Sequence, residues 1–313
     1  MFKSLKLVQF GEHIKQIRRN SGLSQAEVAA QAGLSRDTIR RIERGEVVVR
    51  FDTLVLLSEI YKRDLLDDLR YFSDSTVLFT YYHRLDELIV TNDIETLSQL
   101  RQDFGRFIQQ YETDYPIIIQ TKNQFESFLE AISALISQQY EASVEILIQA
   151  MKFTNPSFDM DDLLSFKYTL FEQRLLIVLA QAISRIGDYK KSNKILHFLY
   201  NRMIKLSSVS LNEKQLLVKI LINLADNYHR MENDKQVMKV AQTGIDYCNE
   251  HFLMYGLHFF LYRLGIAKFH QKLPDYQVAL LHSIMILRIQ QMNEMADYYV
   301  DITKQQYQID IIE

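Results

Sequence analysis

Four alanines recur at one fixed distance before four turn-like positions, and this recurrence constrains the fold more than any other feature. Each alanine stands nine residues before its turn position, and the units are 49, 45 and 42 residues apart. The turn positions are Tyr140, Tyr189, Asp234 and Tyr276, and the alanines are Ala131, Ala180, Ala225 and Ala267. The residues three beyond each turn are also modest in size, namely Ser143, Ser192, Val237 and Ala279. Small residues on both sides of a turn let antiparallel helices approach closely, so the pattern predicts helical hairpins in series.

Glycine and proline are too scarce for an all-β fold. The chain holds nine glycines and three prolines in 313 residues, whereas β-sandwiches and barrels need turn residues every few positions. The length allows two domains with well-packed cores. We therefore expect an all-α protein.

The hairpin repeats are similar to a known repeat family. The clearest unit combines GIAKF at residues 265–269 with PDYQVAL at residues 274–280. It resembles the tetratricopeptide pattern of a small residue, an Asp-Tyr turn and then alanine, although the units exceed 34 residues and lack tryptophan. We call the repeats TPR-like. The resemblance implies a curved solenoid with a concave groove, closed by a last helix from about Glu294 to Gln308.

Residues 23–45 read LSQAEVAAQAGLSRDTIRRIERG and carry the signals of two short helices. Ser24 and Glu27 are spaced for a capping box at the start of the first helix, which we expect to run from Gln25 to about residue 32. Gly33 ends this helix, and Ser35 caps the next one.

The second of these helices has two unlike faces. Ile39 and Ile42 point to one side. The opposite face, within about 140° by the helical period, carries Arg36, Asp37, Arg40, Arg41 and Arg44. A short helix with an apolar back and an arginine front suits the DNA major groove.

This stretch resembles the helix-turn-helix of the XRE family, of Cro and repressor type. The resemblance rests on S-Q-A-E-V-A, A-G-L-S and I-E-R-G and covers about residues 8–70. It implies base contacts by Arg36, Asp37 and Arg41, since arginine suits guanine and aspartate accepts from cytosine. It implies phosphate contacts by Gln25, Ser35, Arg40 and Arg44. The alternative for each residue is an ordinary solvated position.

The flanking sequence completes a five-helix N-terminal domain. We expect a first helix over residues 11–20, an extended linker at Val47–Val49, a helix capped by Asp52 and a fifth capped by Asp64. Residues 1–66 carry a net charge of +4 and the remainder −7. A basic module attached to a larger acidic body predicts a DNA-binding domain at residues 1–70 and a repeat domain at 71–313.

Several classes of protein are disfavoured. The single cysteine, Cys248, excludes an internal disulfide, and no apolar run is long enough for a membrane span or signal peptide, so we expect a cytoplasmic protein without a membrane partner. We find no P-loop, nucleophile elbow, Rossmann or HExxH motif. We therefore expect no enzyme, no catalytic residues, no metal and no cofactor.

The TPR-like register also predicts a binding groove on the repeat domain. In such superhelices the first helix of each pair lines the concave side. The residues placed there are Arg174, Gln181, Lys219, Ile222, Asn223, Asp226, Asn227, Arg230 and Lys268. Asn223 or Asn227 could pair with an extended peptide backbone, and Lys219 or Arg174 could hold a carboxylate. The alternative is that these are surface polar residues on helices of a different rotation.

The combination of the two parts resembles the RRNPP group of quorum-sensing regulators. That resemblance implies a homodimer that binds an inverted repeat in double-stranded DNA, and a short signalling peptide in the concave groove. Two alternatives remain: a regulator whose repeats serve only dimerisation or a protein partner, and an enzyme-modulating protein built from the same repeats.

Overall fold

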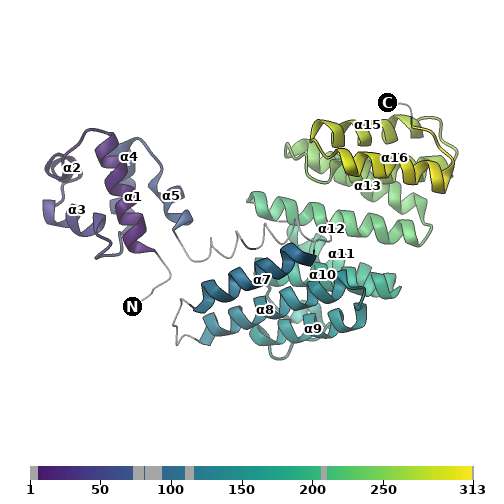
Figure 1. Cartoon of the computed structure of the whole chain (residues 1–313), viewed down its shortest axis with the longest axis horizontal. Helices are drawn as coiled ribbons and strands as arrows, with labels where there is room; N and C mark the ends of the chain where they lie inside the picture. Colours follow the sequence, from purple (N-terminus) through teal and green to yellow (C-terminus); the bar gives the residue numbers. More distant parts are fainter. Residues whose placement is uncertain (1–5, 73–80, 82–93, 110–115, 206–209, 312–313) are drawn as a thin grey trace. The chain divides into compact units, whose positions relative to one another are not determined.

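The computed structural model describes residues 6–72, 81, 94–109, 116–205 and 210–311, and within these ranges all regular secondary structure is helical (Figure 1). The predicted all-α class is confirmed within these ranges. The chain divides into two compact units, residues 1–106 and 107–313. The residue types of Thr91, Asn92 and Asp93 predict a turn, and this prediction falls outside the described residues. The domain boundary at residue 70 remains a prediction about the extent of the N-terminal domain.

The N-terminal unit contains the five expected helices. They are α1 (Leu7–Asn20), α2 (Gln25–Ala32), α3 (Arg36–Glu43), α4 (Phe51–Tyr61) and α5 (Leu65–Tyr71), and α7 (Ile94–Gln109) follows later in the chain. The capping box before α2 is present, because Glu27 N–H donates to Ser24 Oγ at 3.2 Å and Ser24 N–H donates to Glu27 Oε2 at 2.7 Å. Gly33 ends α2 at φ 66°, in the left-handed region that glycine tolerates best.

Two helix starts differ from the sequence prediction. The helix α1 begins at Leu7 rather than near residue 11, because Phe10 joins the buried core of this unit. Asp52 does not cap α4, since the N-cap of that helix is Arg50, two residues earlier, with an extended backbone. Asp52 lies instead in the first turn, where a carboxylate interacts favourably with the helix dipole. Asp64 does accept from the N–H groups of Leu66 and Asp67, as expected of a cap.

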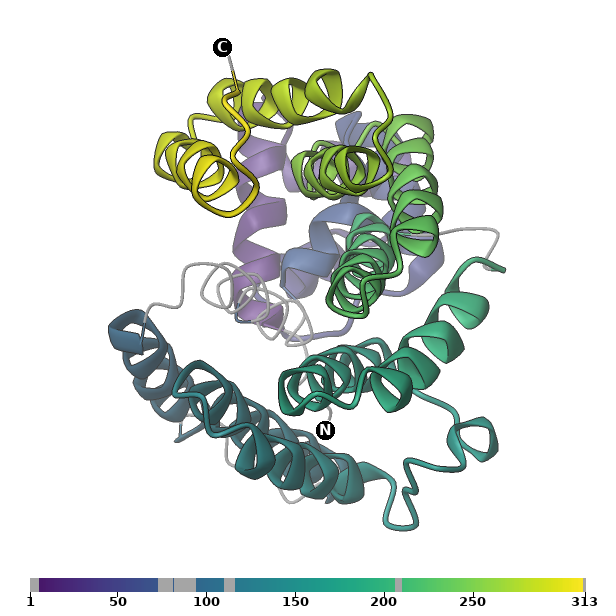
Figure 2. The same ribbon diagram turned by 90° about the vertical axis from the view of Figure 1, so that its right-hand side faces the viewer.

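Eight helices in the described part of the second unit form four antiparallel hairpins. The pairs are α8 (Pro116–Ile136) with α9 (Tyr140–Thr154), α10 (Leu170–Ile186) with α11 (Tyr189–Met203), α12 (Leu211–Arg230) with α13 (Asp234–Glu250), and α14 (Leu257–His270) with α15 (Tyr276–Ile289). A single helix, α16 (Asn293–Tyr307), follows the last pair. Figure 2 shows these hairpins following one another as layers. Each second helix begins at the turn position that the alanine register predicted.

The small residues of the register lie where two helices of a hairpin cross. Ser143 Oγ donates to the carbonyl oxygen of Ala131 at 2.8 Å, and Ser192 Oγ donates to that of Ala180 at 2.7 Å. The third and fourth hairpins place buried Val237 and Ala279 at the equivalent position. A bulkier residue would separate the helices, so the repeat in the sequence is a repeat in helix packing.

Each hairpin turn uses one residue in the left-handed region, and only one of these is glycine. They are Gln138, Gly187, Glu232 and Lys272, with φ of 62°, 102°, 54° and 56°. In all four turns the N–H of the following residue donates to the carbonyl oxygen five residues earlier. These bonds run from Gln139 to Ala134, Asp188 to Ile183, Asn233 to Tyr228 and Leu273 to Lys268. These bonds complete the end of the first helix, which explains how so few glycines suffice.

Candidate nucleic-acid interface and ligand pocket

The helix α3 presents a charged face to solvent and an apolar face to the core. Ile39 and Ile42 are buried at 1% and 3% exposure in the N-terminal core. Arg36, Asp37, Arg41 and Arg44 are exposed, and Arg40 is partly so. The structure therefore brings all three predicted base-contacting residues onto one accessible helix face, with the predicted phosphate contacts Arg40 and Arg44 beside them.

Acidic groups lie among these arginines. Arg40 Nη2 lies 2.6 Å from Asp37 Oδ1, one helical turn away. Glu46, just beyond α3, lies 3.5 Å from Arg44, 3.9 Å from Arg41 and 4.0 Å from Arg40. Exposed pairs of this kind contribute little to stability and exchange readily, so the guanidinium groups remain available to an anionic ligand.

A buried ion pair fixes the back of α3. Arg18 of α1 donates from Nε to Glu43 Oε1 at 2.5 Å and from Nη2 to Glu43 Oε2 at 3.1 Å, and its Nη1 reaches the carbonyl oxygen of Leu23. Glu43 is only 3% exposed. Because the pair joins α1 to the end of α3, it sets the rotation that turns the arginines outward. The sequence did not predict this ion pair, although Glu43 directly follows Ile42, which lies on the apolar side of the helix.

Two predicted phosphate contacts have structural partners. Gln25 Nε2 donates to Glu43 Oε2 at 2.8 Å, so one of its two amide hydrogens is used inside the domain. Ser35 Oγ accepts from Thr38 N–H at 3.0 Å as the cap of α3. Both side chains therefore already have a structural role, and a contact with DNA phosphate would be a second role for each.

Only some of the predicted groove residues in the second unit lie at a pocket in the structure. Asp226 and Arg230 line one pocket, whereas the other members do not line it. Arg174 is buried at 5% exposure, Asn223 Nδ2 donates to Lys219 O at 2.8 Å and Lys268 Nζ lies 2.5 Å from Asp275. Gln181 and Ile222 are half-buried.

Asn227 requires a correction, because its side chain lies in the interior. It is 1% exposed, and its Nδ2 donates to Ser192 Oγ and Asn193 Oδ1, both at 2.8 Å. Its Oδ1 accepts from Ser184 Oγ at 2.6 Å. Both amide hydrogens are donated to α11 and the amide oxygen accepts from α10, so this amide has no donor left for a peptide backbone.

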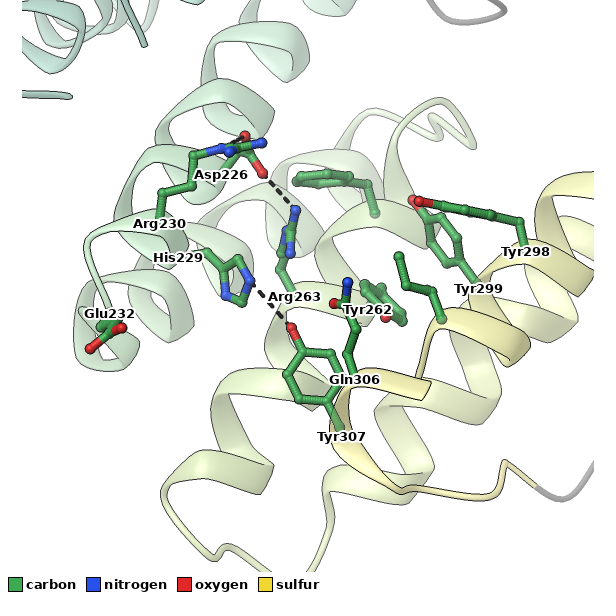
Figure 3. Close-up of a pocket in the computed structure, with 12 residues that line it drawn as sticks. Asp226, His229, Arg230, Glu232, Tyr262, Arg263, Tyr298, Tyr299, Gln306 and Tyr307 are labelled. Carbon is green, nitrogen blue, oxygen red and sulfur yellow. Dashed lines mark hydrogen bonds and ion pairs between the residues drawn. The ribbon is translucent and has the colours of Figure 1, made fainter. Parts of the chain in front are cut away.

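The pocket has a volume of about 590 Å³ and lies between α12, α14 and α16 (Figure 3). Polar residues come from α12 and α14, and tyrosines come mainly from α16. Its lining includes Asp226, His229, Arg230, Phe259, Tyr262, Arg263, Tyr298, Tyr299, Ile302, Gln306 and Tyr307. The lining combines aromatic rings with a comparable number of charged and polar side chains, and a concavity with convergent polar groups is a common form of ligand site.

A carboxylate between two arginines forms the polar side of the pocket. Asp226 Oδ1 lies 2.6 Å from Arg263 Nη2, and its Oδ2 accepts from Arg230 Nε at 2.8 Å. Burial by itself raises the pKa of Asp226, but Arg263 and Arg230 together hold that pKa below its ordinary value. The guanidinium of Arg263 also lies over the Phe259 ring, 5.2 Å from its centroid.

Neutral aromatic groups form the other side. Tyr262 and Tyr299 have ring centroids 4.5 Å apart, and Tyr307 Oη lies 3.4 Å from His229 Nε2. Burial and nearby Arg263 lower the pKa of His229 to about 4, so the imidazole is neutral at pH 7. Burial raises the pKa of Tyr299 to about 12. The pocket therefore offers apolar contact and neutral hydrogen-bonding groups beside one ionic cluster.

Most of this pocket is not predictable from the sequence. The last helix has the polar pattern of a helix that ends a stack, although Tyr299, Ile302 and Gln306 repeat at the spacing of one helix face. Arg263 carried no sequence signal beyond its charge. Among the described residues, no group of His, Cys, Asp and Glu side chains is arranged to bind a metal ion. No helix in the described ranges has the length and apolar character to cross a membrane.

Comparison with known proteins gives matches to the N-terminal helix-turn-helix segment and to the fold of nearly the whole chain. A family model described as a helix-turn-helix domain matches residues 9–70. The chain is 34% identical over 62 residues to an HTH-type transcriptional regulatory protein of Pyrococcus furiosus, a match that covers 20% of this chain and 20% of that protein. The chain thus spans about a fifth of the length of this relative.

Two solved structures are similar over nearly the whole chain. One is Bacillus thuringiensis PlcR in complex with the peptide PapR7 and DNA, with a TM-score of 0.67, 14% identity and coverage of 94% of this chain and 99% of that one. The other is the Streptococcus dysgalactiae SHP pheromone receptor Rgg2, with a TM-score of 0.61, 17% identity and coverage of 95% and 99%. The chain carries a helix-turn-helix domain and has the fold of these two structures.

Proposed function

We propose that this helix-turn-helix protein regulates transcription by binding DNA, and that its repeat unit binds a short signalling peptide that modulates this binding. The observation that carries the proposal is the arginine face of α3, held outward by the buried pair of Arg18 and Glu43. A relative described as a transcriptional regulatory protein and a similar fold solved with DNA support it.

The proposed DNA-binding form is a homodimer that binds an operator with two-fold symmetry. An operator with two-fold symmetry places its half-sites about 34 Å apart or at a multiple of that distance. Two copies of α3 would read the two halves, with Arg36, Asp37 and Arg41 toward base edges and Arg40 and Arg44 toward phosphates. A change in the placement of the two copies would change operator affinity.

The pocket between α12, α14 and α16 is the proposed peptide site. Its size, aromatic wall and Asp226–Arg263–Arg230 cluster suit a short peptide that inserts an apolar or aromatic side chain. Similar folds described as a complex with a peptide and as a pheromone receptor support this assignment. Such a peptide regulates only if it binds one arrangement of the protein more tightly than the other.

Replacing Arg36 and Arg41 together with alanine should reduce DNA affinity strongly. Each bidentate base contact contributes about 1–3 kcal/mol of discrimination, so the double variant should lose at least about tenfold in operator affinity and most of its sequence preference. Fluorescence anisotropy against selected and scrambled duplexes at fixed salt measures both. Arg50→Ala, which removes an 82% exposed guanidinium outside α3, is the matched control. Unchanged binding and preference in the double variant would exclude α3 as the reading helix.

Peptide binding is tested by calorimetric titration with peptides encoded in small open reading frames beside the gene. We expect saturable binding, and Tyr298→Ala should weaken it about fivefold or more by removing part of the pocket wall. Lys239→Ala, an exposed change on α13, should have no effect. If no encoded peptide binds the wild type, the alternative of repeats that serve dimerisation or a protein partner replaces this part of the proposal.

A further inference from the structure

Glu46 lies at the end of the charged face of α3, among three of its arginines. Its Oε1 is 3.5 Å from Arg44 Nη1 and 4.0 Å from Arg40 Nη1, and its Oε2 is 3.9 Å from Arg41 Nε. These four side chains are accessible, with exposed fractions between 39% and 62%. One carboxylate is therefore shared by three guanidinium groups on the surface that is proposed to bind DNA.

The backbone fixes the place of Glu46. Its N–H donates to the carbonyl oxygen of Arg41 at 2.9 Å, which folds the chain back over the last turn of α3. Gly45 permits this fold, because its φ is 65° and a Cβ there would clash with the backbone of Leu7 and Val8 in α1. The close contact with α1 holds the segment, so Glu46 stays beside the arginines.

Stability does not account for a carboxylate at this place. The carboxyl end of a helix carries partial negative charge, so a second negative charge there is unfavourable. The three ion pairs are exposed and are 3.5 Å or longer, and exposed pairs contribute little to the free energy of unfolding. Asp37 differs, because it lies in the first turn of α3, where the helix dipole favours a carboxylate.

The net charge of the face determines how strongly it binds phosphate. Arg36, Arg40, Arg41 and Arg44 are opposed by the two carboxylates of Asp37 and Glu46. Affinity for DNA of any sequence comes mostly from cations that displace counterions from phosphates. The two arginines that are proposed to contact phosphates, Arg40 and Arg44, both lie within 4.0 Å of Glu46. To bind a phosphate each must leave this carboxylate, which then repels the phosphate.

We propose that Glu46 competes with DNA phosphate for Arg40 and Arg44, and so lowers the affinity of a single helix-turn-helix domain for DNA. This inference rests on the proposed function, in which α3 binds DNA. A domain that binds weakly by itself needs a second domain on the same operator for stable binding. Glu46 thereby makes operator occupancy depend on the placement of the two domains, which is the property that the signalling peptide is proposed to change.

The test measures binding of the full-length protein to a hairpin duplex of about 10 base pairs and random sequence, too short for two half-sites about 34 Å apart. Fluorescence anisotropy at several salt concentrations gives the dissociation constant and its salt dependence. We expect Glu46→Gln to lower the dissociation constant at least about fivefold at low salt. The slope of its logarithm against that of the salt concentration should steepen by about one, because about one more phosphate is neutralised.

Glu59→Gln is the matched control, because it removes one negative charge from the same domain. Glu59 lies on α4, where its exposed side chain is 3.7 Å from Lys62. Its dissociation constant and salt slope should equal those of the wild type. Glu46→Gln should melt at the wild-type temperature or slightly above, which would show that the gain in affinity does not come from a change in folding.

The outcomes separate this inference from the proposed function. Wild-type affinity and salt slope in Glu46→Gln would overturn the competition by Glu46 and leave the DNA-binding proposal intact. An equal gain in Glu59→Gln would also overturn it, because net charge alone would then explain the effect. If neither the wild type nor Glu46→Gln binds any duplex, the DNA-binding proposal and this inference fail together.

Discussion

Replacing Arg18 with methionine is expected to unfold the helix-turn-helix domain. The change leaves the Glu43 carboxylate buried, with its side chain 1% exposed, and without its ionic partner. Removing one member of a buried pair costs about 3–5 kcal/mol. A domain of about 65 residues has little more stability than this, so α1, α2 and α3 should lose their order. DNA binding should then be lost even though every residue of the α3 face is present.

Hydrogen exchange with mass spectrometry on the full-length protein measures this effect. Amides of residues 7–43 should exchange much faster in Arg18→Met, while those of the repeat unit should keep their protection. Arg19→Met removes the exposed neighbouring guanidinium and should change little. A double change, Arg18→Met with Glu43→Leu, should restore most of the protection because no buried charge remains. Wild-type protection in Arg18→Met alone would refute the structural role of the pair.

Lowering the pH from 6.5 to 4 is expected to destabilise the repeat unit through His258. Its Nδ1 is buried without a hydrogen-bond partner in the described structure, and burial lowers its pKa to about 4. The unfolded chain, with an ordinary histidine pKa near 6.5, binds a proton over this range that the folded chain does not. The stability contributed by the neutral ring is therefore complete above pH 6.5 and is lost on acidification, by about 3 kcal/mol.

Urea unfolding of the wild type and of His258→Gln, followed by circular dichroism between pH 7.5 and 4.5, measures this dependence. The wild type should lose stability below pH 6.5, and the variant should lose distinctly less. His282→Gln, which replaces an exposed histidine on the next helix, should keep the wild-type slope. If the unfolding free energy of His258→Gln falls with pH as steeply as that of the wild type, another group, for instance His229, causes the acid sensitivity.

Local sequence signals predicted both ends of α2, the start of α3 and the start of the second helix in each repeat hairpin. The Ser24–Glu27 capping box, Gly33 and the alanine register depend on residues close in the chain, and the structure shows each where it was expected. The arginine face of α3 follows in the same way, since a helix of known period with two buried isoleucines fixes its opposite side.

The sequence did not reveal how each repeat helix is rotated. Asn227 follows a polar pattern typical of a groove, yet it is buried among Ser184, Ser192 and Asn193. A polar residue can lie inside when its partners saturate it, and those partners are 34 to 43 positions away in the chain. No local pattern identifies partners at that distance.

The sequence by itself determined the helix ends, the hairpin repeat and the charged face of α3, because these depend on capping, helical period and residue size. The tertiary structure alone decided the pocket. The pocket needs Asp226 of α12, Arg263 of α14 and tyrosines of α16 in one place, and only stacking of the hairpins brings them together.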